Sequence, residues 1–98
     1  MRSKYIVIDV KGYPEAIIFP ETLNHRDVAI KFCNKKEDNS INFDNVLGAG
    51  FVGLRIDENK SISAMPYGES VDLSKVSREE DKNPIEKSLG IYISDLYF

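Results

Sequence analysis

Apolar side chains alternate with other residues over the first ten positions of this chain, which is the pattern of a β-strand. Within residues 4–10, Ile6, Ile8 and Val10 occupy alternate positions and therefore lie on one side of such a strand. We expect that side to be the better buried one. A turn follows at residues 11–14, and residues 15–19 form a second strand. The short separation of the two strands predicts a β-hairpin.

A short helix is predicted after the second strand. Residues 20–23 end the strand, and Asn24 has the side chain of a helix N-cap, with Asp27 three positions beyond it. His25 and Arg26 fall in the first turn of this helix, where we expect exposed side chains. The apolar side of the helix is formed by Val28, Ala29 and Phe32.

Three glycines in the middle of the chain match Gly-x-Gly-x-x-Gly, the fingerprint of dinucleotide-binding folds. They are Gly48, Gly50 and Gly53. The fingerprint requires a helix directly after it, because the pyrophosphate lies at the helix N-terminus. Here a turn-forming run at residues 57–60 and a strand-like run at residues 61–67 follow instead. We therefore expect residues 45–56 to form a strand of an antiparallel sheet. Its glycines leave room for another backbone or a ligand, or they mark a β-bulge.

The last third of the chain predicts a helix with an irregular start. Ser77 and Glu80 match a capping box, in which each side chain bonds the backbone of the other residue. Pro84 interrupts the pattern one to two turns later. We expect a kinked helix, or two short helices, ending at Gly90. The inward residues at four-residue spacing are Ile85 and Leu89.

Residues 91–98 are mostly apolar or aromatic and of strand type. Such a tail either adds a strand to its own sheet or pairs with another chain. We therefore expect a homo-oligomer, most simply a dimer, with residues 91–98 at or near the interface.

These elements predict a single α+β domain over residues 1–98. Two antiparallel hairpins form one twisted sheet, and short helices pack on one face of it. A chain of 98 residues has room for one modest core, and 42% hydrophobic with 30% charged residues is typical of a globular protein. No apolar run is long enough for a signal peptide or a membrane span, so we expect a cytoplasmic protein.

The charge and the reactive side chains argue against several functions. A net charge of -3 disfavours binding to nucleic acid polymers, which requires a basic face. Cys33 is the only cysteine and His25 the only histidine, which excludes an intrachain disulfide and disfavours a zinc site. A catalytic pair of Cys33 and His25 would require the fold to bring the two side chains together. We therefore expect no enzyme, no cofactor and no metal. Residues 34–44 are predicted to be a polar loop.

Two predicted helix starts carry arginines that could each complete an anion site. Arg26 follows the first cap by two positions, and Arg78 follows Ser77. Aromatic residues on the neighbouring strands could stack on a base. The alternative is ordinary helix caps with solvated arginines, whose removal would change folding little. The candidate ligand- or partner-binding residues are Arg78 first, then Arg26, Arg55, Phe51, Tyr67, His25 and Ser77.

Several segments taken together resemble a group of small uncharacterised proteins encoded by bacteriophages and prophages. The resemblance covers most of the chain, from about residue 4 to residue 89, and departs from the group at Pro84 and after Gly90. The segments that carry it are 16–21 (AIIFPE), 24–29 (NHRDVA), 48–52 (GAGFV), 67–73 (YGESVDL), 77–81 (SREED) and 85–86 (IE).

The resemblance implies a small accessory protein that acts inside an infected bacterium, and it brings no catalytic residues with it. We expect such a protein to antagonise a host defence system by stoichiometric binding, either of a defence protein or of a signalling nucleotide that it sequesters. The acidic charge of the chain favours the protein partner. The alternatives are a structural or assembly oligomer without a ligand, and a small enzyme.

Overall fold

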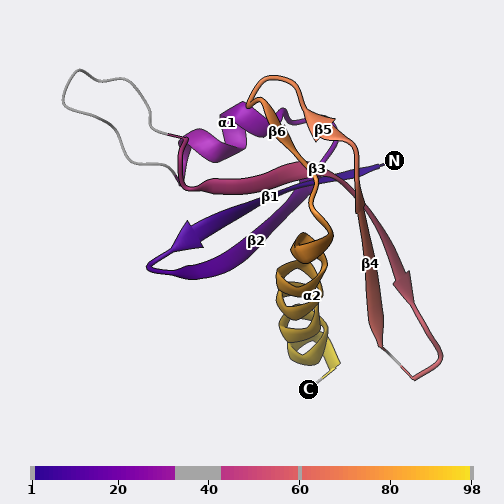
Figure 1. The fold of residues 1–98 in the computed structure, drawn as a ribbon. Coiled ribbons are helices and arrows are strands. Elements are labelled where there is room, and N and C mark those ends of the chain that lie inside the picture. The colour runs from indigo at the N-terminus through magenta and orange to yellow at the C-terminus, as the bar shows by residue number, and fades with distance from the viewer. Residues whose placement is uncertain (1, 33–42, 60, 98) are drawn as a thin grey trace.

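The computed structural model describes residues 2–32, 43–59 and 61–97, with side chains up to residue 89 in the last range. Four antiparallel strands form one sheet in the order β2-β1-β3-β4. The strands are β1 (Ser3–Val10), β2 (Tyr13–Pro20), β3 (Val46–Ile56) and β4 (Ile62–Tyr67). The predicted α+β class and both predicted hairpins are therefore confirmed (Figure 1).

The hairpin between β1 and β2 closes through a loop of two residues. Val10 pairs with Tyr13, so only Lys11 and Gly12 lie between the strands, and both have positive φ, 54° and 89°. Two positive φ angles make the turn that matches the twist of the flanking strands. The Gly12 N–H also donates to Asp9 Oδ1 at 2.8 Å. Residues 13 and 14, predicted to belong to the turn, are thus the start of β2.

The predicted strand over the three glycines is confirmed. Residues 48–53 lie within β3, which pairs antiparallel with β1 and with β4, and no helix begins there. The register between β1 and β3 shifts by one residue at Leu47, which is a β-bulge just before Gly48. A Cβ on Gly50 would lie 2.6 Å from the Tyr67 carbonyl oxygen. The space beside Gly50 that we expected for another backbone or a ligand is therefore filled by the backbone of Tyr67 and Gly68.

Helix α1 (His25–Ile30) begins as predicted, whereas helix α2 (Lys82–Tyr97) differs from the prediction. Asn24 Oδ1 accepts the Asp27 N–H at 2.9 Å, which confirms the N-cap. Helix α2 follows a short 3₁₀ turn, η1 (Glu79–Asp81), and runs without a break through Pro84 and Gly90. Pro84 lies in the first turn, where its missing N–H would have no partner in the helix.

The tail is therefore helical up to Tyr97, and the strand predicted for residues 91–98 is wrong for 91–97. A helix that is already nucleated by the packing of Ile85 extends at low cost, whereas strand propensity depends strongly on its surroundings. Ile85 is buried and Leu89 packs against the same cluster, so this inward pair is confirmed. Phe98 lies outside the described residues.

Both faces of the central strand β1 are buried, and this corrects the expectation of one better-buried face. Tyr5, Ile6 and Val7 are all 0% exposed. Ile6 packs in a cluster with Val28 and Ala29 of α1, while Tyr5 and Val7 pack in a second cluster with Ile85 of α2. Since neighbouring residues of a strand point to opposite faces, α1 and α2 cover opposite faces of the sheet rather than one.

Between β4 and α2 the chain forms a second, two-stranded sheet of β5 (Glu69–Ser70) and β6 (Lys75–Val76). Gly68 makes the bend that starts this segment, with φ of 75°. In Figure 1 the segment rises beside α1 and then descends to α2. It thus connects the two faces of the sheet. Cys33 and the loop over residues 34–42 lie outside the described residues.

Candidate functional site

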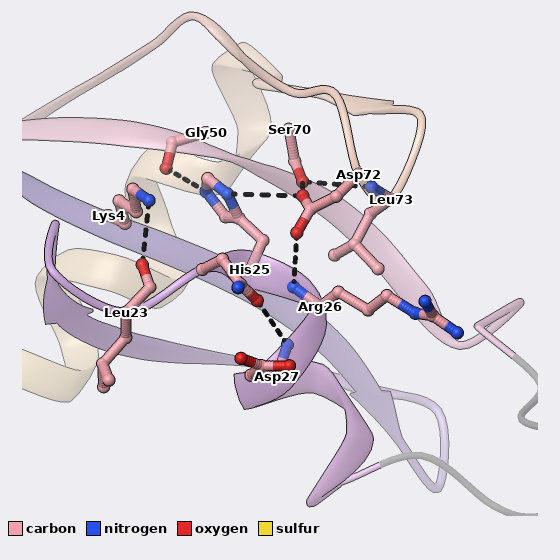
Figure 2. Close-up of polar contacts among 10 residues, drawn as sticks. Lys4, Leu23, His25, Arg26, Asp27, Gly50, Ser70, Asp72 and Leu73 are labelled. Atoms are coloured by element: carbon pink, nitrogen blue, oxygen red, sulfur yellow. Dashed lines mark hydrogen bonds and ion pairs between the residues drawn. The ribbon is translucent and has the colours of Figure 1, made fainter.

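His25 is the centre of the most elaborate polar arrangement on the α1 face of the sheet. The residue is 4% exposed, and its ring lies edge-on between two aromatic rings, with centroid distances of 5.5 Å to Phe19 and 6.0 Å to Phe51. Its Nε2 lies 2.7 Å from the Gly50 carbonyl oxygen (Figure 2). Gly50 is one residue beyond the part of β3 that pairs with β4. A carbonyl can only accept, so His25 donates through Nε2 to an oxygen that β4 does not reach.

Phe51 belongs to a row of side chains that crosses all four strands at the same level. Strand register pairs Lys4 with Phe19 and with Phe51, and pairs Phe51 with Tyr67. The rings of Phe51 and Tyr67 stack, with centroids 5.7 Å apart and planes inclined by 23°. The Arg2 guanidinium carbon lies 4.3 Å from the Phe51 ring centroid. The row therefore ends in an aromatic pair with a cation on one side.

Asp72 connects the segment after β4 to the start of α1. Its Oδ1 accepts the Ser70 hydroxyl at 2.6 Å, and its Oδ2 accepts the Arg26 N–H at 3.1 Å. Burial acts to raise the pKa of Asp72, but these hydrogen bonds outweigh it and hold the pKa below its usual range. Asp72 is therefore ionised at neutral pH. Its carboxylate occupies the position that an anionic ligand would take at this helix N-terminus.

These elements surround an open hollow on the α1 face, which we call the Phe51 hollow. One rim carries Val71, which is 81% exposed, and Tyr67 beside the hollow is 44% exposed. Charged groups of both signs line the hollow. The lining residues are Lys4, Asn24, His25, Phe51, Gly68, Glu69, Val71 and Asp72.

Of the seven residues predicted from sequence, three lie at this hollow, and the other four, Arg26, Arg55, Ser77 and Arg78, do not line it. His25, Phe51 and Tyr67 come together, although His25 is buried rather than exposed as predicted. The exposed side chain of Arg26 extends away from His25, and its guanidinium carbon lies 5.9 Å from the Phe43 ring centroid (Figure 2). The Ser77 N–H donates to the Gly68 carbonyl at 3.0 Å. Arg55 lies four residues beyond Phe51 on β3, about 13 Å away by strand rise.

The hydrogen-bond donors of Arg78, the first candidate from the sequence, are engaged by the buried carboxylate of Asp81. Its Nε and Nη2 donate to Asp81 Oδ1 at 3.0 and 2.6 Å, and its backbone N–H donates to Asp81 Oδ2 at 3.0 Å. Asp81 is 0% exposed and also accepts the Tyr5 hydroxyl at 2.5 Å. Burial, with this hydrogen bond, raises the pKa of Tyr5 far above its usual range, so Tyr5 remains a donor.

This arrangement corrects two expectations about the second helix start. The Asp81 carboxylate accepts the Arg78 backbone N–H and the Asp81 N–H donates to the Arg78 carbonyl, so this helix start lies one residue later than the predicted capping box of Ser77 and Glu80. The guanidinium of Arg78 is part of a buried ion pair, with a side chain only 28% exposed, rather than a solvated group. We expected the removal of Arg78 to change folding little because we took the side chain to be exposed and solvated. That premise is wrong.

Ser70, His25 and Asp72 are the residue types of a hydrolytic triad, but their contacts are of a different kind. In such a triad the serine bonds the histidine and the carboxylate bonds the other ring nitrogen. Here Ser70 bonds Asp72, and His25 Nδ1 lies 4.0 Å from Asp72 Oδ1, too far for a hydrogen bond. In the part of the chain that the structure describes, no three His, Cys, Asp or Glu side chains are placed to hold a metal ion.

Several residues at the hollow were not found by sequence reasoning. They are Arg2, Lys4, Glu69, Val71 and Asp72. Lys4 reaches Phe51 only through the pairing of β1 with β3, which joins positions 47 residues apart. Asp72 reaches α1 only because the chain bends at Gly68. No local pattern signals either contact, because both depend on strand register and on the path of a loop.

Comparison with known proteins adds no assignment to this geometry. No family model matches the chain, and neither a curated protein nor a solved structure matches it. Among the helices described, none is long and apolar enough to cross a membrane.

We expect the stability of the protein to fall on mild acidification because of His25. Burial lowers the pKa of His25 below its ordinary value of 6.5; the Lys4 charge adds to this, while the Gly50 carbonyl and Asp72 oppose it. The unfolded chain therefore takes up a proton at higher pH than the folded protein does. The free energy of unfolding is then constant above about pH 7 and decreases as the pH falls through 6.5 toward the folded pKa.

Urea titrations at several pH values between 7.5 and 5.5 measure this effect. The control is His25→Gln, whose side-chain amide can still donate to the Gly50 carbonyl but does not titrate. The wild-type protein should lose stability over this interval relative to the variant. Parallel pH profiles for the two proteins would show that burial of His25 does not depress its pKa.

Proposed function

We propose that this protein acts by stoichiometric binding of a partner and that the Phe51 hollow is its binding surface. The observation that carries the proposal is the apolar and aromatic surface gathered there. Val71 of the lining is 81% exposed, Tyr67 is 44% exposed, and the ring of Phe51 is stacked on that of Tyr67. Large exposed side chains grouped around a hollow are typical of sites that a partner covers, whereas scattered ones are common on any surface.

The polar groups of the hollow support binding rather than turnover. His25, the only histidine of the chain, donates through Nε2 to a backbone carbonyl and makes no hydrogen bond to Ser70 or Asp72 that could relay a proton. A nucleophile requires a base in contact with it, and Ser70 instead donates to a carboxylate. These contacts hold α1, β3 and the segment after β4 in one arrangement, which is what a preformed binding surface requires.

The resemblance to phage and prophage proteins supplies the biological context of the proposal. In that context the protein is an accessory protein in the cytoplasm of an infected bacterium, and its partner belongs to a host defence system. Both forms of the function remain proposals: binding of a defence protein, and sequestration of a signalling nucleotide. The occupation of both predicted anion sites by Asp72 and Asp81 supports the protein form.

Replacement of Tyr67 with alanine should weaken partner binding by about 2 kcal/mol or more, roughly thirtyfold, because exposed tyrosines at the centre of an interface contribute strongly. The matched control is Tyr13→Ala, at the start of β2 in the other hairpin and 73% exposed. The tagged proteins would be isolated from cells that carry active defence systems, and the retained molecules identified by mass spectrometry and titrated.

A retained protein or nucleotide that Tyr67→Ala loses and Tyr13→Ala keeps would support the proposal. Equal losses would remove the Phe51 hollow from the binding surface. Consumption of a molecule in excess over the protein would instead support the enzyme alternative. A homo-oligomer without any ligand, measured by light scattering, would support the structural alternative. Leu54 and Ile56, 43% and 60% exposed on the hairpin of β3 and β4, are available to such an interface.

A further inference from the structure

Two carboxylates line the Phe51 hollow, and neither forms an ion pair with a lysine or arginine in the described part of the chain. Asp72 is ionised, and among the described residues its one group of opposite charge within 4.0 Å would be a protonated His25, whose lowered pKa keeps it neutral at pH 7. Glu69 is exposed and forms no ion pair within the described part of the chain. Among the described lining residues the one cation is Lys4; its ammonium group keeps its charge but is held at the Leu23 carbonyl, to which it donates at 2.8 Å.

Two hydrogen-bond acceptors in the hollow face each other without a donor between them. Because the His25 ring donates through Nε2, its Nδ1 is an acceptor when the ring is neutral. This nitrogen lies 4.0 Å from Asp72 Oδ1, while the His25 side chain is 5% exposed. A donor N–H placed between the two atoms could bond to both of them.

The chain itself shows how a guanidinium fits against this aromatic pair. The Arg2 guanidinium lies over the Phe51 ring at 4.3 Å, while its Nε donates to Glu21 at 3.0 Å. A flat cation thus stacks on a ring and bonds a carboxylate at the same time. Tyr67, stacked on Phe51 and 44% exposed, offers a second ring, and Glu69 a second carboxylate, two residues further along the chain.

Phosphate-bearing ligands fit these groups less well. The N-terminus of α1 is occupied by Asp72, and the donors of Arg78 are occupied by Asp81 on the other face of the sheet. The carboxylates of the hollow would repel a phosphate, and the net charge of -3 adds to that repulsion.

We propose that the Phe51 hollow receives an arginine or lysine side chain of a partner protein. The carboxylates of Glu69 and Asp72 and the Nδ1 of His25 accept its N–H groups, and the aromatic pair of Phe51 and Tyr67 packs along it. This inference rests on the proposed function and names the chemistry of the partner. Arginine fits better than lysine because its planar fork can bond several acceptors while stacking on a ring.

The probe for this inference is the peptide acetyl-Gly-Arg-Gly-amide, and its neutral counterpart has citrulline in place of arginine. Backbone amide shifts of the ¹⁵N-labelled full chain would be followed while each peptide is added. We expect saturable shifts at Gly68, Glu69 and Val71 with the arginine peptide, and binding at least about fivefold weaker with the citrulline peptide. Added salt should weaken the arginine peptide more than the citrulline peptide.

Glu69→Gln should weaken the arginine peptide about fivefold, because it removes one charge while leaving the size of the side chain unchanged. The matched control is Glu58→Gln in the turn between β3 and β4, an exposed glutamate at the opposite end of this hairpin from the Phe51–Tyr67 pair. Equal binding of both peptides, equal effects of both variants, or no saturable shift at these amides would overturn the inference. Stronger shifts of the same amides with adenosine monophosphate would instead assign the hollow to a nucleotide.

The outcome is separate from that of the proposed function. If Tyr67→Ala loses a retained partner but the arginine peptide does not bind, the hollow remains a binding surface and only its preference for a cation is wrong. If the arginine peptide binds specifically and no partner is lost with Tyr67→Ala, the cation site stands and the proposed function falls.

Discussion

Replacing Arg78 with alanine is expected to lower the free energy of unfolding by about 3–5 kcal/mol. Asp81 is 0% exposed. Among the described side chains, the guanidinium of Arg78 is the only cation bonded to its carboxylate. Without it, Asp81 keeps only the Tyr5 hydroxyl and one backbone N–H. A buried charge without its counter-ion is far less stable than the same charge in water. For a protein of this size the loss is a large part of the total stability.

Urea unfolding of the two proteins at pH 7 measures this difference. The matched control is Arg55→Ala on β3, where the arginine is exposed, and this variant should remain within about 0.5 kcal/mol of the wild type. If Arg78→Ala behaves like Arg55→Ala, the guanidinium of Arg78 is solvated in solution and is again a candidate for ligand binding.

Replacing Gly48 with alanine is expected to lower the free energy of unfolding by about 3 kcal/mol, although the change adds a single methyl group. A Cβ at this position would lie 2.2 Å from Asp81 Oδ2 and 2.8 Å from Asp81 Oδ1. The carboxylate would have to move away from Tyr5 and Arg78, so the cost combines overpacking with weakened buried hydrogen bonds. The conformation of Gly48 is not the cause, because its φ is not positive.

The matched control is Gly53→Ala in the same strand and the same glycine motif. Its Cβ would meet nothing closer than the Met65 Cε at 3.8 Å, so stability should be unchanged or rise by up to about 1 kcal/mol. The double variant of Gly48→Ala with Arg78→Ala should lose less than the sum of the two single losses, since both act on Asp81. Equal effects of the two glycine substitutions would show that Asp81 moves aside freely.

Local sequence was sufficient for the elements whose signals lie within a few residues. The N-cap of Asn24 and the strand over the three glycines were predicted correctly, and the turn predicted for residues 11–14 is present but consists only of Lys11 and Gly12. Each depends on backbone conformation or on bonds between near neighbours, such as the Asp27 N–H that Asn24 accepts. The α+β class followed from the alternation of strand and turn signals, which the sheet order β2-β1-β3-β4 bears out.

The candidate site was predicted only in part, because its contacts are long-range. Phe51 and Tyr67 were identified by residue type, but their stacking follows from the register of β3 with β4. His25 was expected to be exposed, yet it is buried because Gly50, 25 residues away, presents a carbonyl that β4 does not reach. Arg78 was expected to be solvated, but Asp81 is buried beside it.

The sequence by itself thus determined the hairpins, the N-cap of Asn24, the glycine strand and the fold class, because these follow from local conformational preference and from the spacing of apolar residues. Only the tertiary structure decided which face each helix covers, whether the tail is helix or strand, and which charged groups meet a partner within the chain. Burial sets the protonation of His25 and the cost of separating Arg78 from Asp81, and burial is a property of the packed chain rather than of any short segment.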